Sequence, residues 1–185
     1  MLFRSVIGAV LSFASVLIRS VSPPRDVLGV IRGSQGFYSL KRYPKAYPIL
    51  HVVIYRFSAN LFFANIDVFE EDLKKCMDAD TRVVIVDASG ITSLDLTAAK
   101  HIDCLYRRMK SRGIAFYLAE HIAEINDALR KAGYGYIIED GGVSRTIAGA
   151  LRAAGMSRPF TLKGEEWQRP ELGSFRKQRS EERRV

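Results

Sequence analysis

Apolar residues follow two different periods along the middle of the chain, which predicts alternating strands and helices. Short apolar runs rich in β-branched residues are typical of strands, and they occur at residues 27–31, 51–57, 82–86 and 114–118. Apolar residues spaced three and four apart are typical of helices, and they occur at residues 66–77, 96–112, 122–132 and 144–154. Because strands and helices alternate, the pattern predicts an α/β domain with a largely parallel centre.

Shorter signals complete this prediction. Two short apolar runs, at residues 61–64 and 136–138, predict further strands, whereas residues 38–48 contain two prolines and are expected to be irregular. Asp95 is the expected N-cap of the 96–112 helix. Asn65 or Asp67 is the expected N-cap of the 66–77 helix.

The first twenty residues contain an apolar run of 13 residues, 6–18, bounded by Arg4 and Arg19. A helix needs about 20 residues to cross a bilayer, so this run is too short to span one alone. We expect residues 1–20 to be an interfacial helix or the end of a membrane helix that begins earlier, with a buried core helix as the structural alternative. Two prolines then predict a linker at residues 21–26.

The net charge of +8 is concentrated near the start of the chain. Residues 1–50 carry seven Lys or Arg and one acid, whereas residues 51–162 carry 14 of each kind. A nucleic-acid-binding domain carries its basic face on the folded part, so no nucleic-acid partner is predicted. Basic residues beside an apolar run predict contact with an anionic membrane surface near residues 1–45. Residues 159–185 are polar and aperiodic, which predicts a disordered tail after a domain at 27–158.

Hydroxyl and carboxyl side chains gather between the 82–86 strand and the 96–112 helix, where ligands and partners bind in open α/β sheets. They are Asp87, Ser89, Thr92, Ser93, Asp95 and Thr97. A metal site or a phosphoacceptor would need further acids at the same edge, and no second acidic pair follows another strand. We therefore favour the structural alternative, in which Asp87 and Ser89 bond loop amides and Asp95 caps the helix.

No enzyme signature accompanies these residues. The chain lacks GxxxxGK[ST], HExxH and GxSxG motifs, and its three histidines share no spacing. Cys76 and Cys104 form no CxxC pair, which excludes a zinc ribbon and a disulfide framework. Gly141 and Gly142 precede a predicted helix and form either a turn or an anion site. The sequence thus predicts no enzyme, no cofactor and no metal.

Three segments carry a resemblance to a known family. YRFSANLFFAN at 55–65, VVIVDASGITSLDLTAA at 83–99 and RRMKSRGI at 107–114 resemble the C-terminal STAS domain of SulP-type anion transporters (sulfate permeases). The likeness covers about residues 27–155. A pattern D-x-S followed by D-x-[ST]-[GA], shared with anti-sigma-factor antagonists, is present as Asp87, Ser89, Asp95, Thr97 and Ala98.

The resemblance implies a STAS-like α/β sheet of about four to six strands with helices packed on it, preceded by a partial membrane helix. It implies a cytoplasmic regulatory and interaction domain, residues 27–185, at the inner (plasma) membrane. The transporter would carry sulfate or a related inorganic anion through membrane helices outside these 185 residues. The implied partners are the membrane domain of the same or a neighbouring chain, a second copy in a homodimer, and a regulatory protein.

The resemblance also assigns roles to residues. The expected interaction and regulatory loop comprises Asp87, Ser89, Thr92, Ser93, Asp95, Leu96 and Thr97. In the antagonist branch a phosphorylatable serine follows the second aspartate, and here Leu96 stands there, so Thr97 is the remaining candidate for modification. Asp87, Ser89 and Asp95 are the candidate nucleotide-binding residues. The alternative function is a free-standing STAS signalling protein of the antagonist type, anchored through residues 6–18.

Overall fold

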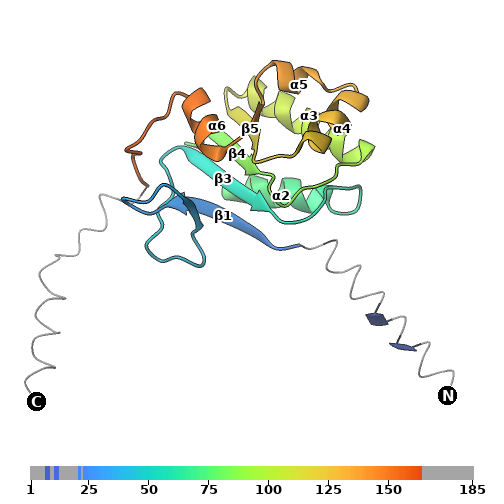
Figure 1. Cartoon of the computed structure of the whole chain (residues 1–185), viewed down its shortest axis with the longest axis horizontal. Helices are drawn as coiled ribbons and strands as arrows, with labels where there is room; N and C mark the ends of the chain where they lie inside the picture. Colours follow the sequence, from blue (N-terminus) through green and yellow to red (C-terminus); the bar gives the residue numbers. More distant parts are fainter. Residues whose placement is uncertain (1–6, 9–10, 13–20, 22, 164–185) are drawn as a thin grey trace, which may run out of the picture.

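Six strands form one mixed sheet in the computed structural model, which describes residues 7–8, 11–12, 21 and 23–163 (Figure 1). The strands are β1 (Arg25–Val30), β2 (Phe37–Ser39), β3 (Val52–Phe57), β4 (Val83–Asp87), β5 (Ala115–Ala119) and β6 (Val143–Ser144). The helices are α2 (Ile66–Cys76), α3 (Leu96–Ser111), α4 (Ala123–Lys131), α5 (Tyr136–Glu139) and α6 (Ile147–Ala153).

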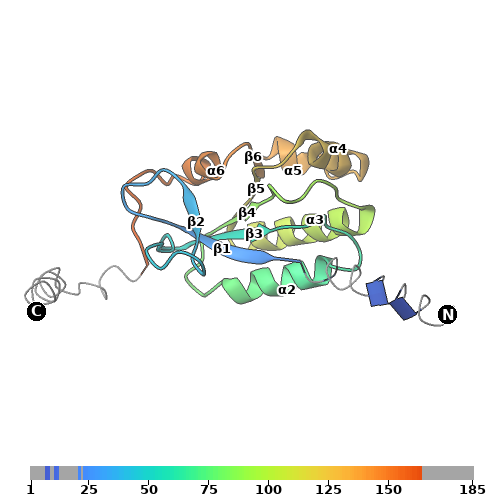
Figure 2. The ribbon, with the colours of Figure 1, turned by 60° about the horizontal axis from the view of Figure 1, so that its bottom comes forward.

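The strands lie in the order β2-β1-β3-β4-β5-β6, and β3 to β6 run parallel. We name the side of the sheet at which these parallel strands end the carboxyl edge, and the opposite side the amino edge. Strand β1 is antiparallel to β3 and pairs Arg25 with Phe57, so the chain enters the sheet at the carboxyl edge. Figures 1 and 2 place the start of β1, the tip of β3 and α4 on the same side.

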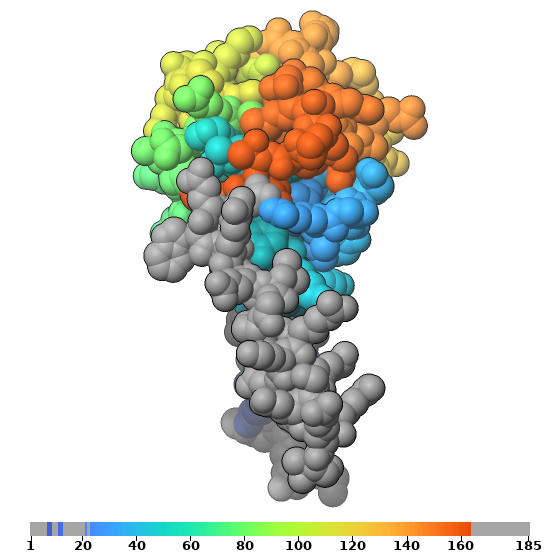
Figure 3. All heavy atoms as spheres, turned by 90° about the vertical axis from the view of Figure 1, so that its left-hand side faces the viewer, coloured from blue at the N-terminus to red at the C-terminus, as the bar shows by residue number. Residues whose placement is uncertain are grey.

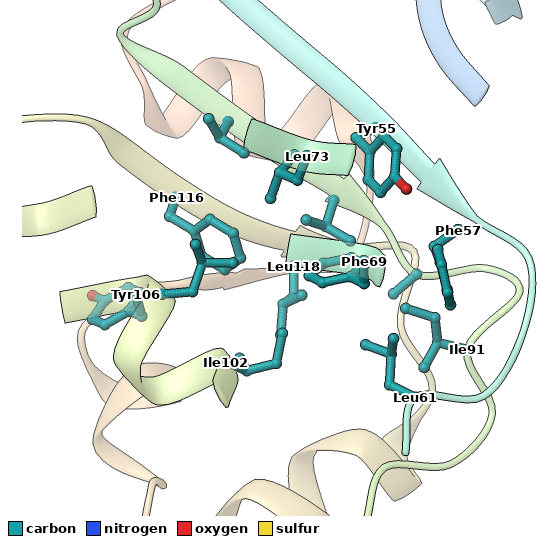
Figure 4. Packing of buried hydrophobic residues seen from close by; sticks show 14 of the residues in the cluster. Tyr55, Phe57, Leu61, Phe69, Leu73, Ile91, Ile102, Tyr106, Phe116 and Leu118 are labelled. Atoms are coloured by element: carbon teal, nitrogen blue, oxygen red, sulfur yellow. The ribbon is translucent and has the colours of Figure 1, made fainter. Parts of the chain in front are cut away.

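Alternate residues of the central strands face two separate cores, because these strands are covered on both sides. Val53, Tyr55 and Phe57 of β3 face the larger core, which α2 to α5 complete. Phe69 of α2 stands edge-on to Phe57 there, with ring centroids 5.4 Å apart, a favourable geometry for aromatic pairs. Figure 4 shows this core, with Ile102 of α3 facing the same interior.

Helix α6 and the segment after it cover the second face of the sheet. Ile54 packs there in one cluster with Leu151 and Leu162, and Leu162 forms an isolated bridge with Ile49. Arg158 donates hydrogen bonds of 2.6 and 2.7 Å to two carbonyl oxygens of the turn between β1 and β2. Figure 3 shows this last packed segment, in orange, beside the blue β1–β2 region. The final residues of the domain therefore close its second core.

The predicted α/β architecture with a parallel centre is confirmed, but two predicted strands are not strands. Residues 136–138 begin helix α5, because Ile138 donates its amide locally to Gly135 while the sheet position beside β5 is taken by β6. An apolar run of three residues fits either structure. Of residues 61–64, only Leu61 pairs, in a single parallel bridge with Leu94.

Two other elements differ from the prediction at their ends. Residues 38–48, expected to be irregular, begin with two residues of β2. The helix predicted at 144–154 begins later, at Ile147, because Ser144 pairs with Ala119 of β5. The Thr146 hydroxyl then accepts the amide of Gly149 and caps α6.

The expected terminal segments lie largely outside the described residues. This applies to most of the helix predicted at 1–20 and to residues 164–185 of the predicted tail. In the part of the chain that the structure describes, no helix has the length and apolar content needed to span a bilayer. Residues 159–163 pack against the domain, since Leu162 is buried and Lys163 donates its amide to Pro48. The packed domain thus extends past the expected boundary at 158.

Replacing Leu162 with alanine should lower the free energy of unfolding by about 2–3 kcal/mol, because the change removes buried methyl groups and leaves a cavity. Urea unfolding followed by circular dichroism measures this loss. The matched control is Thr161→Ala at the exposed neighbouring position, which should cost less than about 0.5 kcal/mol. Equal losses in the two variants would contradict the role of this segment in the second core.

Candidate functional site

Two loops lie side by side at the carboxyl edge. Residues 58–65 follow β3 and residues 88–95 follow β4. Leu61 donates its amide to Ser93 at 3.2 Å, and Asp95 donates its amide to the carbonyl of Leu61 at 3.2 Å. We call these two segments the paired loops. Their backbone bonds continue the parallel pairing of β3 and β4 beyond the ends of the strands.

The side chain of Asn60 joins the paired loops. Its Oδ1 accepts the Thr92 amide at 2.9 Å, the Thr92 hydroxyl at 2.7 Å and the Ser93 amide at 3.1 Å. Three donors on one oxygen fix the path of the second loop at Thr92 and Ser93, which lie beyond the end of β4. Thr92 and Ser93, two residues of the expected interaction loop, are therefore held in place by the first loop.

Asn65 braces the first loop from inside. It is fully buried, its Oδ1 accepts the Phe62 amide at 3.0 Å, and its Nδ2 donates to the carbonyl of Asn60 at 2.8 Å. Asn65 also stands at the N-cap position of α2, as one of the two expected caps, but its side chain makes no cap hydrogen bond. Its polar atoms hold the loop that carries Asn60.

Asp95 has two roles at the start of α3. Its Oδ1 accepts the Ala98 amide at 2.7 Å, which confirms the predicted N-cap. Its Oδ2 accepts the Phe63 amide at 2.9 Å, so the same carboxylate also ties the first loop to the helix. Gly90 allows the close approach of the loops, since a Cβ there would lie 2.7 Å from Cα of Ser58.

Asp87 is a buried half of an ion pair. Its side chain is fully buried, Oδ2 accepts Nε of Arg56 at 2.7 Å, and Oδ1 accepts the Ser89 amide at 3.0 Å. Arg56 and Asp87 are direct neighbours in the register of β3 and β4. The expected bond to a loop amide is confirmed, and Arg56 is an additional partner that compensates the buried charge.

The other expected site residues lie on the surface of the paired loops and the first turn of α3. Ser89, Thr92, Ser93, Leu96 and Thr97 are all exposed, which leaves their side chains accessible to a partner. Exposure also leaves the Thr97 hydroxyl accessible to a modifying enzyme. Modification of Thr97 and nucleotide binding at Asp87, Ser89 and Asp95 both stay predictions.

A groove of about 490 Å³ separates the start of α3 from α4. Leu94, Leu96 and two alanines line its apolar part, and Asp95, Glu124, Asp127 and Lys131 line its polar part. Three carboxylates against one ammonium give the groove a negative charge, which opposes the approach of a polyphosphate.

The described residues contain no group of three or more His, Cys, Asp or Glu side chains that could hold a metal ion. The turn at Gly141 and Gly142 leads into β6, and the N-terminus of α6 is already occupied, because Glu120 Oε1 accepts the Ile147 amide at 3.0 Å. The turn is thus not an anion site of the kind that the sequence left open.

Tyr55 marks the place where the incoming chain meets α2. Its hydroxyl donates to Oδ2 of Asp72 at 2.9 Å, and Nε of Arg25 lies 3.6 Å from the same oxygen. Burial, followed by the hydrogen bond to Asp72, raises the pKa of the Tyr55 phenol far above its usual value. The phenol therefore stays protonated and holds β1, β3 and α2 together.

Sequence reasoning identified Asp95 as a cap and Asn65 as a candidate cap, but it missed Asn60, Arg56 and the bonds by which Asn65 holds the first loop. Asn60, Arg56 and Asn65 all stand within the run at 55–65 that carries the family resemblance. An asparagine in a loop just after a strand is a signal for side-chain to backbone bonding, although its partners lie about 30 residues away in sequence. Phe63, which the apolar run at 61–64 places in a strand, lies in the first loop and is exposed.

The STAS domain family matches residues 43–150, and the chain belongs to this family. A probable sulfate transporter of Mycobacterium tuberculosis is 31% identical over 155 residues, covering 82% of this chain and 28% of that protein. Probable sulfate transporter 4.2 of Arabidopsis thaliana is 31% identical over 140 residues, covering 69% of this chain and 21% of that protein. The chain thus spans less than a third of the length of these relatives, whose names describe transporters and not enzymes.

Solved structures show the same fold. The murine Solute Carrier 26 family member A9 anion transporter, in its inward-facing state, has a TM-score of 0.73 and 22% identity, covering 83% of this chain and 25% of that chain. A sulfate transporter family protein from Wolinella succinogenes has a TM-score of 0.51 and 22% identity, covering 60% of this chain and 89% of that chain. The resemblance to a STAS domain with transporter homologues is therefore confirmed.

Replacing Asn60 with alanine removes the acceptor of three hydrogen bonds and should lower the free energy of unfolding by about 1–2 kcal/mol. Hydrogen exchange of the Thr92 and Ser93 amides, followed by NMR, should become about tenfold faster. Asn60→Asp keeps an oxygen acceptor and should retain most of the protection. Unchanged exchange in Asn60→Ala would show that this side chain does not join the paired loops.

Replacing Arg56 with methionine should lower the free energy of unfolding by about 2 kcal/mol, because the Asp87 carboxylate stays buried without its cation. The loss is moderate because the Arg56 side chain is 40% exposed. Adding Asp87→Asn should restore part of this stability, since the buried group becomes neutral. Urea unfolding of the wild type, both single variants and the double variant gives the coupling, and strictly additive losses would contradict the pairing.

Proposed function

We propose that the chain is the cytoplasmic regulatory and interaction domain of a SulP-type secondary transporter of sulfate or a related inorganic anion. Two relatives with 31% identity are named probable sulfate transporters, and most of their length lies outside the part matched by this chain. In this proposal the anion crosses the membrane through that other part. The domain described here contributes contacts that favour one state of the transporter over another.

The observation that carries the proposal is the position of the paired loops. They lie at the carboxyl edge, and Ser58 in the first loop donates its amide to Pro24 at 3.0 Å, where the chain enters the domain. Any structure joined through residues 1–22 is therefore connected to the domain at this surface. Exposed side chains on a braced loop are typical of a surface that binds a partner.

The membrane domain of the same or a neighbouring chain is the partner that this position favours. Residues 27–185 would then lie on the cytoplasmic side of the inner (plasma) membrane. A second copy in a homodimer and a regulatory protein are further candidates for the same surface. Arg25 lies at the carboxyl edge and Arg32 follows the opposite end of β1, so only part of the basic group in residues 1–45 can face one anionic membrane.

An antibody against residues 27–155 should detect a band of about 50 kDa or more in the membrane fraction of the native source. This mass corresponds to about ten membrane helices of about 20 residues each in addition to the domain. A soluble band near 20.8 kDa would contradict the proposal and favour a free-standing signalling protein.

The regulatory role is tested in the longer protein. Asn60→Ala, which loosens the paired loops, should change the initial rate of radiolabelled sulfate uptake by about twofold or more, because it alters the contact that biases the transporter. The amount of protein in the membrane, measured on the same blot, is the control. An unchanged rate at equal amount would show that the paired loops do not regulate transport.

A further inference from the structure

Large apolar side chains stay exposed after each of the three central parallel strands. Phe63 follows β3, Leu96 follows β4 and Ile122 follows β5, with exposed fractions of 69%, 70% and 38%. Phe63 and Leu96 are neighbours, because Asp95 precedes Leu96 and accepts the Phe63 amide. We call these three residues the apolar surface. Single exposed apolar residues are ordinary, whereas several gathered at one edge are typical of a binding surface.

Two residues of the apolar surface, Phe63 and Leu96, lie on backbone that bonds already described hold in place. Phe63 is fixed at its amide by Asp95 and packs edge-on against Phe62, with ring centroids 5.6 Å apart. Leu96 is the first residue of a helix whose cap is formed by the same Asp95. A backbone that is already ordered loses little conformational entropy on binding, so Phe63 and Leu96 are well placed to anchor a partner.

The groove beside Leu96 supplies charge. Glu124 and Asp127 are exposed on the first turns of α4, and Asp127 forms an ion pair with the equally exposed Arg130, at 3.2 Å. Asp95 is committed to two backbone amides, which leaves Glu124 and Asp127 as the carboxylates that can pair with an incoming cation. The groove therefore combines an apolar wall, formed by Leu94 and Leu96, with an acidic rim, in which three carboxylates outnumber the one ammonium, that of Lys131.

We propose that the apolar surface and this groove bind a cationic amphipathic helix, supplied by a Lys- or Arg-bearing segment at the cytoplasmic end of a membrane helix. This proposal rests on the proposed function and names the chemistry of the partner. Cytoplasmic flanks of membrane helices carry an excess of Lys and Arg, which complements the acidic rim. The chain enters the domain at the same edge, where Ser58 donates its amide to the carbonyl of Pro24, so a membrane helix joined through residues 1–22 would be linked covalently to the domain at this surface.

Charge separates this partner from two others. Anionic lipid headgroups would meet Glu124 and Asp127, which repel them. A second copy bound through the same surface would bring the acidic rims of the two copies together, which is unfavourable for like charges. A cationic helix with an apolar face satisfies both parts of the surface at once.

The probe is an 18-residue leucine–lysine peptide with the period of an amphipathic helix, and its control has glutamate in place of every lysine. The full 185-residue chain should bind the lysine peptide at least about tenfold more tightly than the glutamate peptide, measured by fluorescence anisotropy. Amide shifts in NMR spectra should be confined to the apolar surface and α4. Equal affinity for both peptides, or shifts elsewhere, would overturn the proposal.

Variants locate the site. Phe63→Ser with Leu96→Ser, and separately Glu124→Lys with Asp127→Lys, should each weaken lysine-peptide binding about tenfold or more. The matched control is Asp80→Lys with Glu139→Lys, which makes the same charge change at exposed positions near the amino edge and should leave binding unchanged. Circular dichroism confirms that each variant is folded. Equal loss in the control pair would reveal general charge attraction and overturn the proposal.

Two outcomes separate this inference from the proposed function. If the longer membrane protein is found but both surface variants bind the lysine peptide normally, the surface assignment fails and the proposed function stands. If peptide binding behaves as expected but only a soluble 20.8 kDa protein is found, the surface binds a cationic helix of another partner and the membrane source is wrong.

A third outcome would identify lipid as the partner. The variant Phe63→Ser with Leu96→Ser would then lose binding to phosphatidylglycerol vesicles and keep its binding to the lysine peptide, which would overturn the proposal.

Discussion

The hydrogen bonds between the loops that follow β3 and β4 are the constraint on which the rest of the carboxyl edge depends. At this edge the side chain of Asn60 supplies one oxygen to three donors of the neighbouring loop. The resulting path of the loop places Asp95 where one carboxylate oxygen caps α3 and the other accepts the amide of Phe63. The start of α3 and the backbone of Phe63 are thus both held by the carboxylate of Asp95.

The same edge separates charges that look alike in sequence. Asp87 and Asp95 both follow β4, but Asp87 is buried against Arg56 whereas Asp95 bonds two amides at the surface. Neither carboxylate is left without a partner in the structure, so both serve the architecture of the loops. The accessible acids of the groove, Glu124 and Asp127, lie on α4. The sequence analysis described this helix only by its apolar face and did not single out these two acids.

The sequence was sufficient where a feature is local. The period of apolar residues predicted the central strands and α3, and the spacing of Asp95 from the helix predicted its cap. The sequence was insufficient where a side chain bonds to a residue far along the chain. Asn60 contacts residues 32 and 33 positions away, and Arg56 contacts a residue 31 positions away. Helix α5 was misread for the opposite reason, since a run as short as residues 136–138 contains too little pattern to distinguish a strand from a helical turn.

The chain enters the domain at the carboxyl edge, and its last packed residues complete the second core at the amino edge. Arg25 pairs with the end of β3, whereas Lys163 bonds to Pro48 ahead of the start of β3, so the two points are separated by the length of the sheet. A six-residue strand spans about 20 Å. A rotation of the whole domain about the paired loops would therefore displace Lys163 further than the loops themselves. A fluorescent label at Lys163 would report such a rotation without covering the paired loops.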